Sequence, residues 1–219
     1  MKKSALFSLV LLVFSAQGFA QGKSLITKLD SPACNKDGKL QLDFFVMSYC
    51  PYSVRFMDTT LAAMINDLGD SLEWTPYFIT ERDGGKLVSM HGKKEVDEDL
   101  RMVCIREKFG RKQWLGYANC FSQQILAKQQ TGGAKKWKDC ALQVDINPDD
   151  IDKCVKNEAD KLIEKDIKLS NDFHAYGSPT AVYNCSNQIV GAIPYKKIKA
   201  QVCKLIPGDK PAACKALKK

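Results

Sequence analysis

The clearest structural signal in the chain is the apolar run Leu40–Met47, which is rich in aromatic and β-branched residues. Such a run is typical of a strand that is buried on both faces of a sheet. Beyond it, apolar residues recur at spacings of three and four as far as Gly69. This spacing predicts a helix over Tyr52–Leu68, with Gly69 at its C-terminal end.

The rest of the chain alternates further strands with helices, and a long helical stretch interrupts the alternation. This order is typical of the α/β class with a helical insertion. The predicted elements are a strand over Glu73–Ile79, a charged loop over Glu81–Lys86, helices between Asp97 and Asp172 (one starting at Asn147-Pro148), strands over Ala181–Tyr183 and Gln188–Ala192, and a last helix after Pro194.

The first twenty residues have the three parts of a secretory signal peptide. They are the basic start Met1-Lys2-Lys3, the apolar stretch Ala5–Ala16, and the small residues Gly18 and Ala20. The stretch is short for a membrane span, and no later one approaches ~20 apolar residues. We therefore expect removal of residues 1–20 and a protein exported to the periplasm or secreted, with no membrane partner.

Composition narrows the function classes without naming one. The chain is 45% hydrophobic and 26% charged, which argues against a disordered, collagen-like or coiled-coil protein. Its formal net charge of +8 comes from scattered lysines interleaved with acidic residues, so we interpret it as a solvated basic surface. No nucleic-acid-binding motif is recognisable, and we expect no nucleic-acid partner.

The nine cysteines are more informative about function than the overall composition. In an exported protein they indicate a disulfide framework, and an odd number leaves at least one thiol outside it. Cys50, between the first predicted strand and helix, is the candidate for that thiol. A helix N-terminus stabilises a thiolate and so lowers the pKa of a cysteine placed there. The thiolate is the nucleophile of disulfide exchange, which predicts that Cys50 is reactive rather than a small buried residue.

Cys50-Pro51-Tyr52-Ser53, directly after a buried strand, resembles the active-site turn of the thioredoxin superfamily. That turn is usually Cys-x-x-Cys, and here Ser53 occupies the position of the second cysteine. The resemblance implies that Cys50, Pro51 and Ser53 form the catalytic turn. The Ser53 hydroxyl can donate a hydrogen bond to the sulfur of Cys50 but cannot resolve a mixed disulfide.

Ser178-Pro179, before the predicted pair of late strands, is the second resemblance to this superfamily. The superfamily carries a proline there, commonly cis, that faces the reactive cysteine. The resemblance implies that Pro179 belongs to the catalytic site and that Ser178 offers backbone groups to an extended substrate. We expect Tyr49, just before the reactive turn, and Tyr52, within it, to contact substrate as well.

A more specific resemblance begins at His91. His91, Gly92, Glu95 and Cys104 match, at the right spacing, the signature of the gamma-interferon-inducible lysosomal thiol reductase family. The signature reads Cys-Gln-His-Gly-x-x-Glu-Cys-x-x-Asn-x-x-x-x-Cys. This chain differs from it at four positions, Ser89, Met90, Val96 and Asp99.

The family resemblance covers roughly Leu40 to Cys214 and implies a thioredoxin-like fold with a disulfide-stapled α-helical insertion. The expected organisation is a signal peptide (1–20), an N-terminal extension (21–38), the first part of the thioredoxin-like domain (39–88), the helical insertion (89–172), the second part of the domain (173–208) and a C-terminal tail (209–219). The Met-Lys-Lys start is typical of bacteria, so the lysosomal setting is not carried over.

Eight cysteines remain for disulfides, and sequence leaves their pairing open. Four lie in the predicted insertion and are expected to pair among themselves, namely Cys104, Cys120, Cys140 and Cys154. Cys203 and Cys214 are expected to close a local loop. Cys34 and Cys185 either pair with each other, or one of them approaches Cys50 and resolves it.

Two other readings of the polar and sulfur-containing residues are open. His91, with Glu95 nearby, is either a general base near a thiol or a residue that cross-links its loop by hydrogen bonds, and the second role is the commoner one. Met47, Met57, Met90 and Met102, with Cys50, are soft ligands of the kind copper(I) prefers. Their spacing is not that of a copper site, so we interpret them as packing residues and predict no metal and no cofactor.

Together these residues predict a thiol-disulfide oxidoreductase with a single reactive cysteine. Its substrate would be a protein or small molecule that contains a disulfide, and an external thiol or redox partner would release the mixed disulfide. One rival is a redox-inactive module that keeps the groove near Ser178-Pro179 to hold extended polypeptide. The other is a metal-binding protein.

Overall fold

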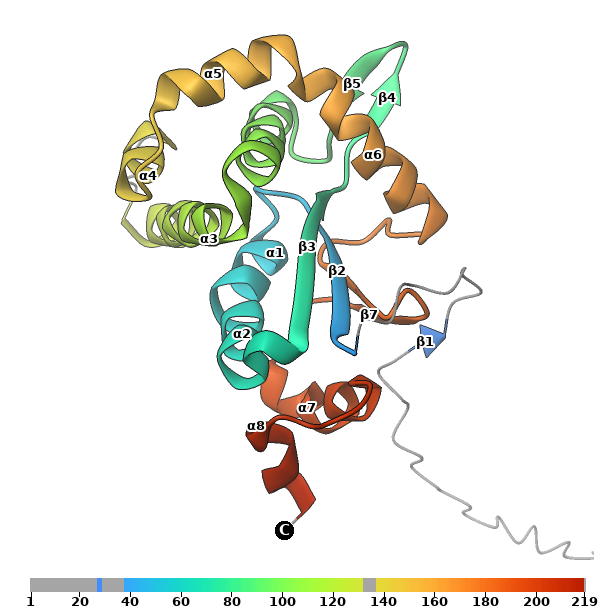
Figure 1. Cartoon of the computed structure of the whole chain (residues 1–219). Helices are drawn as coiled ribbons and strands as arrows, with labels where there is room; N and C mark the ends of the chain where they lie inside the picture. The colour runs from blue at the N-terminus through green and yellow to red at the C-terminus, as the bar shows by residue number, and fades with distance from the viewer. Residues whose placement is uncertain (1–26, 29–37, 132–136, 219) are drawn as a thin grey trace, which may run out of the picture.

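A five-stranded sheet forms the centre of the molecule in this computed structural model, which describes residues 27–28, 38–131 and 137–218 (Figure 1). Its strand order is β1-β7-β6-β2-β3, with β2 and β3 parallel and the other pairs antiparallel. The fold is thus the mixed α/β arrangement that the sequence predicts. The predicted signal peptide and Cys34 lie outside the described residues.

The apolar run becomes β2 (Leu40–Val46), which lies between β3 (Leu72–Phe78) and β6 (Thr180–Tyr183). Six of its seven residues are buried, because both faces of the strand are covered. Phe44 on one face packs against aromatic rings of the following helix and of the insertion, and Phe45 on the other stacks on Tyr77.

The helix predicted after β2 is present as three joined segments, α1 (Pro51–Arg55), a π-helical turn (Phe56–Leu61) and α2 (Ala62–Leu68). Its apolar positions face the core, and Gly69 ends it with a φ of +49°. The sequence did not predict the π-helical turn, because a single wider turn shifts the apolar positions too little to be seen in their spacing.

The prediction of a loop over Glu81–Lys86 is wrong in part. The segment contributes to a hairpin of β4 (Glu81–Asp83) and β5 (Lys86–Val88) around Gly84 and Gly85, whose φ values are +53° and +81°. A two-residue turn with positive φ joins antiparallel strands well, and glycine adopts it without strain. Since neither strand has a buried residue, no buried face marked them in the sequence.

Four helices follow, α3 (Lys93–Thr131), α4 (Trp137–Gln143), α5 (Pro148–Asn157) and α6 (Ala159–Asp172). The first is two helical stretches joined at Gly110, where φ is +83°. The predicted helix start at Asn147 is confirmed, because its side chain accepts a hydrogen bond from the Asp149 N–H. In Figure 1 these helices arch over the end of the sheet toward which β2 and β3 run.

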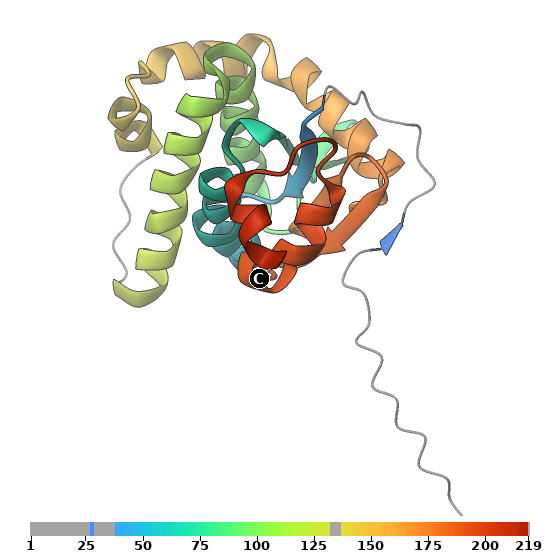
Figure 2. The ribbon, with the colours of Figure 1, turned by 60° about the horizontal axis from the view of Figure 1, so that its bottom comes forward.

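The remaining elements close the opposite end. They are β7 (Asn187–Val190), α7 (Tyr195–Leu205), α8 (Ala212–Lys215) and a 3₁₀ turn (Ala216–Lys218), with β1 (Thr27–Lys28) paired to β7. Figure 2, seen from that end, places α7 and α8 in front of the sheet.

Three disulfides are fully described. Cys104–Cys154 joins α3 to α5, Cys120–Cys140 joins α3 to α4, and Cys203–Cys214 joins α7 to α8. The first two pair the four cysteines of the helical insertion among themselves. The third closes the expected local loop.

A buried ion pair fastens the insertion to the edge strand β3. Arg106 of α3 and Asp166 of α6 form two hydrogen bonds of 2.8 and 2.9 Å, and their side chains are only 6% and 0% exposed. Arg106 also donates to the carbonyl of Pro76, and Asp166 accepts the N–H of Phe78. Backbone groups of an edge strand are thereby paired by side chains from two helices.

We predict that Asp166→Ala destabilises the protein by about 3–5 kcal/mol, because it leaves the Arg106 guanidinium buried and unpaired. Urea unfolding with the disulfides intact measures the change. The matched control is Asp172→Ala, which removes a half-exposed ion pair with Lys168 on the same helix and should change stability little. Equal losses in the two variants would contradict the prediction.

Candidate active site

Cys50 is the last residue of a tight turn between β2 and α1. Its N–H donates to the carbonyl of Met47 at 3.1 Å, which closes the turn Met47–Cys50. Cys50 is the N-cap residue of α1, with extended backbone angles, and Pro51 takes the first helical position. The first turn of α1 carries no acidic residue. The cysteine therefore has the place at a helix N-terminus that the sequence predicts.

Among the described residues, Cys50 is the one free cysteine. Its side chain is 8% exposed and packs in an apolar cluster with Phe45, Met47 and Ile79. Its Sγ lies 3.5 Å from the backbone carbonyl oxygen of Ser178. The thiol thus faces the Ser178-Pro179 segment across the end of the sheet.

The Ser178–Pro179 peptide bond is cis. The Ser178 hydroxyl accepts the N–H of Met47 at 2.8 Å, so the proline loop is tied directly to the Cys50 turn. Ser178 therefore contacts that turn through both its carbonyl and its hydroxyl.

Ser53 differs from the expectation that its hydroxyl bonds to the Cys50 sulfur. Its side chain is fully buried, and its hydroxyl forms a short hydrogen bond with the hydroxyl of Ser178. The reason is geometric, since Ser53 lies in the first turn of α1 on the side that faces the proline loop. Ser53 thus connects α1 to that loop.

The two tyrosines predicted to contact substrate differ in their surroundings. Tyr52 is 63% exposed beside Cys50. The Tyr49 ring packs edge-on against Phe121 of α3, with centroids 5.4 Å apart, and the Lys94 ammonium lies over it at 4.7 Å. Burial raises the pKa of Tyr49, and nearby carboxylates add to the effect. Tyr52 is accessible to a ligand, whereas Tyr49 mainly joins the turn to the insertion.

Two carboxylates of α3 reach the Cys50 turn, a contact that sequence reasoning missed. Asp99 Oδ1 accepts the N–H of Ser48 at 3.1 Å, and Glu95 Oε2 accepts the N–H of Tyr49 at 2.9 Å. Both side chains are fully buried, and burial raises the pKa of Asp99 well above its usual range. Their spacing of four residues, one helical turn, was the available signal.

His91 lies in the same network. Its backbone N–H and its Nδ1 both lie within hydrogen-bond distance of the Glu95 carboxylate, at 3.1 and 2.9 Å. This is the loop cross-linking role rather than a contact aimed at a thiol.

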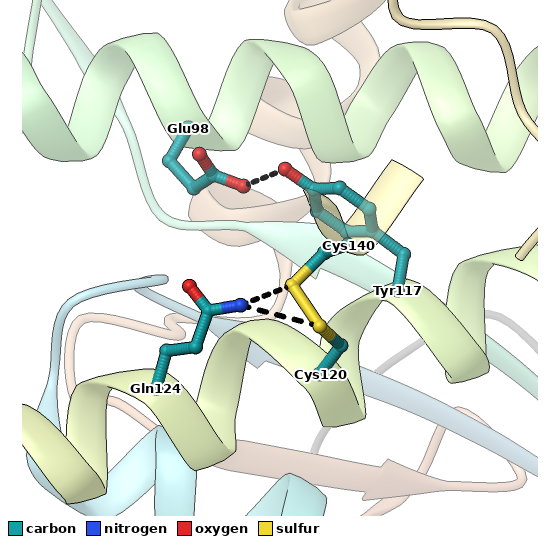
Figure 3. The surroundings of a disulfide bond; sticks show 5 residues. All are labelled: Glu98, Tyr117, Cys120, Gln124 and Cys140. Atoms are coloured by element: carbon teal, nitrogen blue, oxygen red, sulfur yellow. Dashed lines mark hydrogen bonds between the residues drawn. A yellow bond between two sulfur atoms is a disulfide. The ribbon is translucent and has the colours of Figure 1, made fainter. Parts of the chain in front are cut away.

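A third buried carboxylate of α3, Glu98, has different partners. It accepts hydrogen bonds from the Tyr117 hydroxyl and from Arg101. Figure 3 shows the Glu98–Tyr117 bond beside the Cys120–Cys140 disulfide, toward which the Gln124 amide points. Burial raises the pKa of Glu98 as well, with Arg101 opposing it.

The open alternative for Cys185 can be narrowed. Cys185 is itself in a disulfide, so it does not stand as a free resolving thiol beside Cys50.

Within the described ranges, no three His, Cys, Asp or Glu side chains gather as a metal site. No helix in those same ranges is long and apolar enough to cross a membrane.

A hollow of about 310 Å³ opens beside the site, with Met47 and Ile79 at its base. Its rim includes the exposed apolar side chains Val88, Met90 and Tyr176. Exposed apolar side chains of this size, gathered at one place, are typical of a surface that binds other molecules.

Comparison with known proteins agrees with this geometry. Residues 41–144 match the family model described as Gamma interferon inducible lysosomal thiol reductase (GILT). The chain is GILT-like, with a thioredoxin-type fold. No curated protein matches the sequence.

Several solved structures are similar to this GILT-like chain. The thiol-disulfide exchange protein α-DsbA2 of Wolbachia pipientis is 17% identical, with a TM-score of 0.58 over 81% of this chain and 88% of that one. BdbD of Bacillus subtilis is also 17% identical, with a TM-score of 0.61 over 81% and 94%. Reduced DsbA1 of Neisseria meningitidis is 12% identical, with a TM-score of 0.57 over 86% and 93%. At these identities the likeness shows the fold, and the family match supports a thiol-disulfide oxidoreductase in the general sense.

One more buried acid lies behind the site of this GILT-like chain. Asp43 alternates with Phe45 and Met47 along the chain, which directs all three toward one face of the sheet. It is 4% exposed and accepts a hydrogen bond from the Gln41 amide at 3.2 Å. Burial raises the pKa of Asp43 from 3.8 to about 6, although Gln41 and Lys165 oppose the shift.

This shift has a definite consequence for stability. Since the folded state holds the proton more tightly than the unfolded state, stability falls as pH rises from about 4 to 6. We predict that Asp43→Asn, which cannot ionise, is more stable than the wild type at pH 7.5 by about 1–3 kcal/mol. The two proteins should unfold alike at pH 4 in urea titrations. The exposed control Asp70→Asn should show no such divergence, and an Asp43→Asn difference that is independent of pH would contradict the prediction.

Proposed function

We propose that this protein catalyses thiol-disulfide exchange through Cys50 alone. The observation that carries the proposal is the pairing of a free cysteine at a helix N-terminus with a serine at the position of the usual resolving thiol. The Ser178-Pro179 loop next to the sulfur supports it, and so does the family match. In this proposal Cys50 is the nucleophile, and Pro51, Ser53 and Pro179 shape the catalytic site around it.

The reaction has two exchange steps. The Cys50 thiolate attacks one sulfur of a substrate disulfide, so that a bond from Cys50 to that sulfur forms and the other substrate sulfur leaves as a thiolate. A second thiolate then attacks the mixed disulfide and regenerates the Cys50 thiolate. If this thiolate belongs to the substrate, the result is isomerisation. If it belongs to an external thiol, the substrate loses one sulfur link to Cys50 and gains one to that thiol.

Because Ser53 carries no thiol, the second thiolate must come from outside the catalytic turn. Disulfide exchange requires a thiolate as the nucleophile, and a serine hydroxyl does not replace it. The mixed disulfide therefore cannot be resolved from within the catalytic turn. The chain by itself therefore neither stores nor delivers two electrons.

The surroundings of Cys50 favour a polypeptide substrate. Tyr52 and the rim of the neighbouring hollow expose apolar side chains, which suit the side chains of an unfolded or extended segment. Ser178, Tyr49 and Tyr52 are the proposed substrate contacts, with the backbone of Ser178 pairing with the segment near its cysteine.

We also propose that the protein works outside the cytoplasm, in the periplasm or after secretion. The signal-peptide pattern of residues 1–20 supports this location, and structural disulfides persist mainly in oxidising compartments. The same compartment holds the disulfide-containing substrates and the external thiol that the reaction requires.

The proposal predicts a trapped intermediate. The purified protein lacking residues 1–20, mixed with a disulfide-containing peptide, should accumulate one covalent adduct at Cys50, seen by intact mass and peptide mapping. Adding a low-molecular-weight thiol should release it. Cys50→Ser should form no adduct. A wild-type protein that forms none either would leave the redox-inactive binding module as the better explanation.

Ser53→Cys provides the converse test. The substitution restores Cys-x-x-Cys, so the adduct should no longer accumulate. Oxidised protein should appear instead, two hydrogens lighter, with a disulfide between Cys50 and the sulfur introduced at position 53. Ser53→Ala is the matched control, because it also removes the hydrogen bond to Ser178 but supplies no thiol. Adduct accumulation in Ser53→Cys equal to that in the wild type would contradict the assignment of Ser53 to the resolving position.

A further inference from the structure

The Cys50 turn has a complete set of hydrogen-bond partners for its four backbone N–H groups. Met47 donates to the Ser178 hydroxyl, and Cys50 donates back to the carbonyl of Met47. The two central groups, of Ser48 and Tyr49, cannot bond within the turn and point away from it. Asp99 and Glu95 accept them. All four donors are thus satisfied, two of them by side chains of one helix.

The spacing of the two acids matches that of the two donors. Glu95 and Asp99 are separated by one helical turn on α3, and Ser48 and Tyr49 are adjacent in the chain. The acids bond to the donors in opposite order, so that the first turns of α3 run back along the Cys50 turn. A shift of α3 along its axis would lengthen both bonds, so the pair fixes the position of α3 relative to the Cys50 turn.

Each carboxylate is in turn held by other side chains. Glu95 Oε1 accepts the Ser89 hydroxyl at 2.6 Å and the His91 N–H at 3.1 Å. Asp99 Oδ2 accepts the Thr80 hydroxyl at 3.5 Å. Both oxygens of each acid are therefore engaged, and neither side chain is free to rotate away from the turn.

We propose that Glu95 and Asp99 are positioning residues for Cys50. By fixing the central N–H groups of the turn, they hold the Cys50 sulfur against the Ser178 carbonyl, where a substrate segment paired with Ser178 would present its disulfide. Disulfide exchange needs three sulfur atoms nearly in line, and small errors in placement cost much of the rate. This inference rests on the proposed reaction at Cys50.

The position of these residues in the chain explains part of the family signature. His91, Gly92 and Glu95 are three of the four matching residues, and Asp99 stands where the family has asparagine. An asparagine there keeps a side-chain oxygen that can accept the Ser48 N–H. We therefore interpret this motif as the segment whose side chains hold the reactive turn, in addition to any role in disulfide pairing.

The test compares two reactions of the same sulfur. One is exchange with a peptide whose single cysteine is disulfide-bonded to an aryl thiol. Its rate is measured from the absorbance of the coloured aryl thiolate that leaves. The other is alkylation of Cys50 by iodoacetamide, which has no requirement for a paired peptide. We expect the ratio of exchange rate to alkylation rate to fall about 10-fold or more in Glu95→Ala and in Asp99→Ala. Asp99→Asn, which keeps the acceptor for Ser48, should retain most of the wild-type ratio.

The ratio separates positioning from a loss of stability. General loosening of the fold would expose the buried Cys50 to both reagents, so its effect on the ratio is measured separately in a variant of a third buried acid. Glu98→Ala is the matched control, because Glu98 is as buried on the same helix but bonds to Tyr117 and Arg101. It should lower stability without lowering the ratio. If Glu95→Ala fails to fold, Ser89→Ala removes one support of Glu95 without touching the turn, and should lower the ratio by a smaller factor.

The outcomes are distinct for the two proposals. A wild-type protein that forms no peptide adduct would overturn the proposed function. A wild-type protein that reacts, with Glu95→Ala and Asp99→Ala lowering the ratio no more than Glu98→Ala does, would overturn the positioning role and leave the proposed function standing.

Discussion

Buried backbone donors and acceptors at the end of the sheet must find partners, and this constraint organises the molecule. Where β2 and β3 end, the sheet supplies few, and the helical insertion supplies the rest. Asp166 and Arg106 pair with Phe78 and Pro76 on the edge strand. Asp99 and Glu95 pair with the Cys50 turn. The insertion therefore completes the hydrogen bonding of the thioredoxin-like sheet as well as covering it.

Completing those bonds with carboxylates has an electrostatic cost. Burial raises the pKa of Asp166 and of Asp99, which means that the charged form of each is disfavoured where it lies. The cost of burying the Asp166 charge is offset by the Arg106 guanidinium, which lies 2.8 Å away. Asp99 accepts hydrogen bonds from neutral donors, including the Ser48 N–H and the Thr80 hydroxyl, and forms no ion pair with any described residue. The two junctions thus reach the same end by different means, a salt bridge at the strand and neutral hydrogen bonds at the turn.

Sequence predicted the parts of this arrangement that depend on local pattern. The buried strand, the helix after Cys50 and the helix start at Asn147 follow from periodicity and capping. The β4–β5 hairpin was missed because its strands bury no face, so alternation left no trace. The network around Glu95 was missed for another reason, since which buried group an acid faces is decided by packing between segments far apart in the chain.

Ser53 connects the fold to the chemistry. In a Cys-x-x-Cys protein the first turn of the helix changes its covalent state in every cycle, because the second cysteine is free in one half and bonded in the other. Here the same position carries a hydroxyl that bonds to Ser178 and takes no part in exchange. The link between α1 and the proline loop therefore stays the same whether Cys50 is free or in a mixed disulfide. With the turn also held by two acids of α3, the scaffold around the sulfur remains constant through the proposed cycle, and the sulfur alone changes partners.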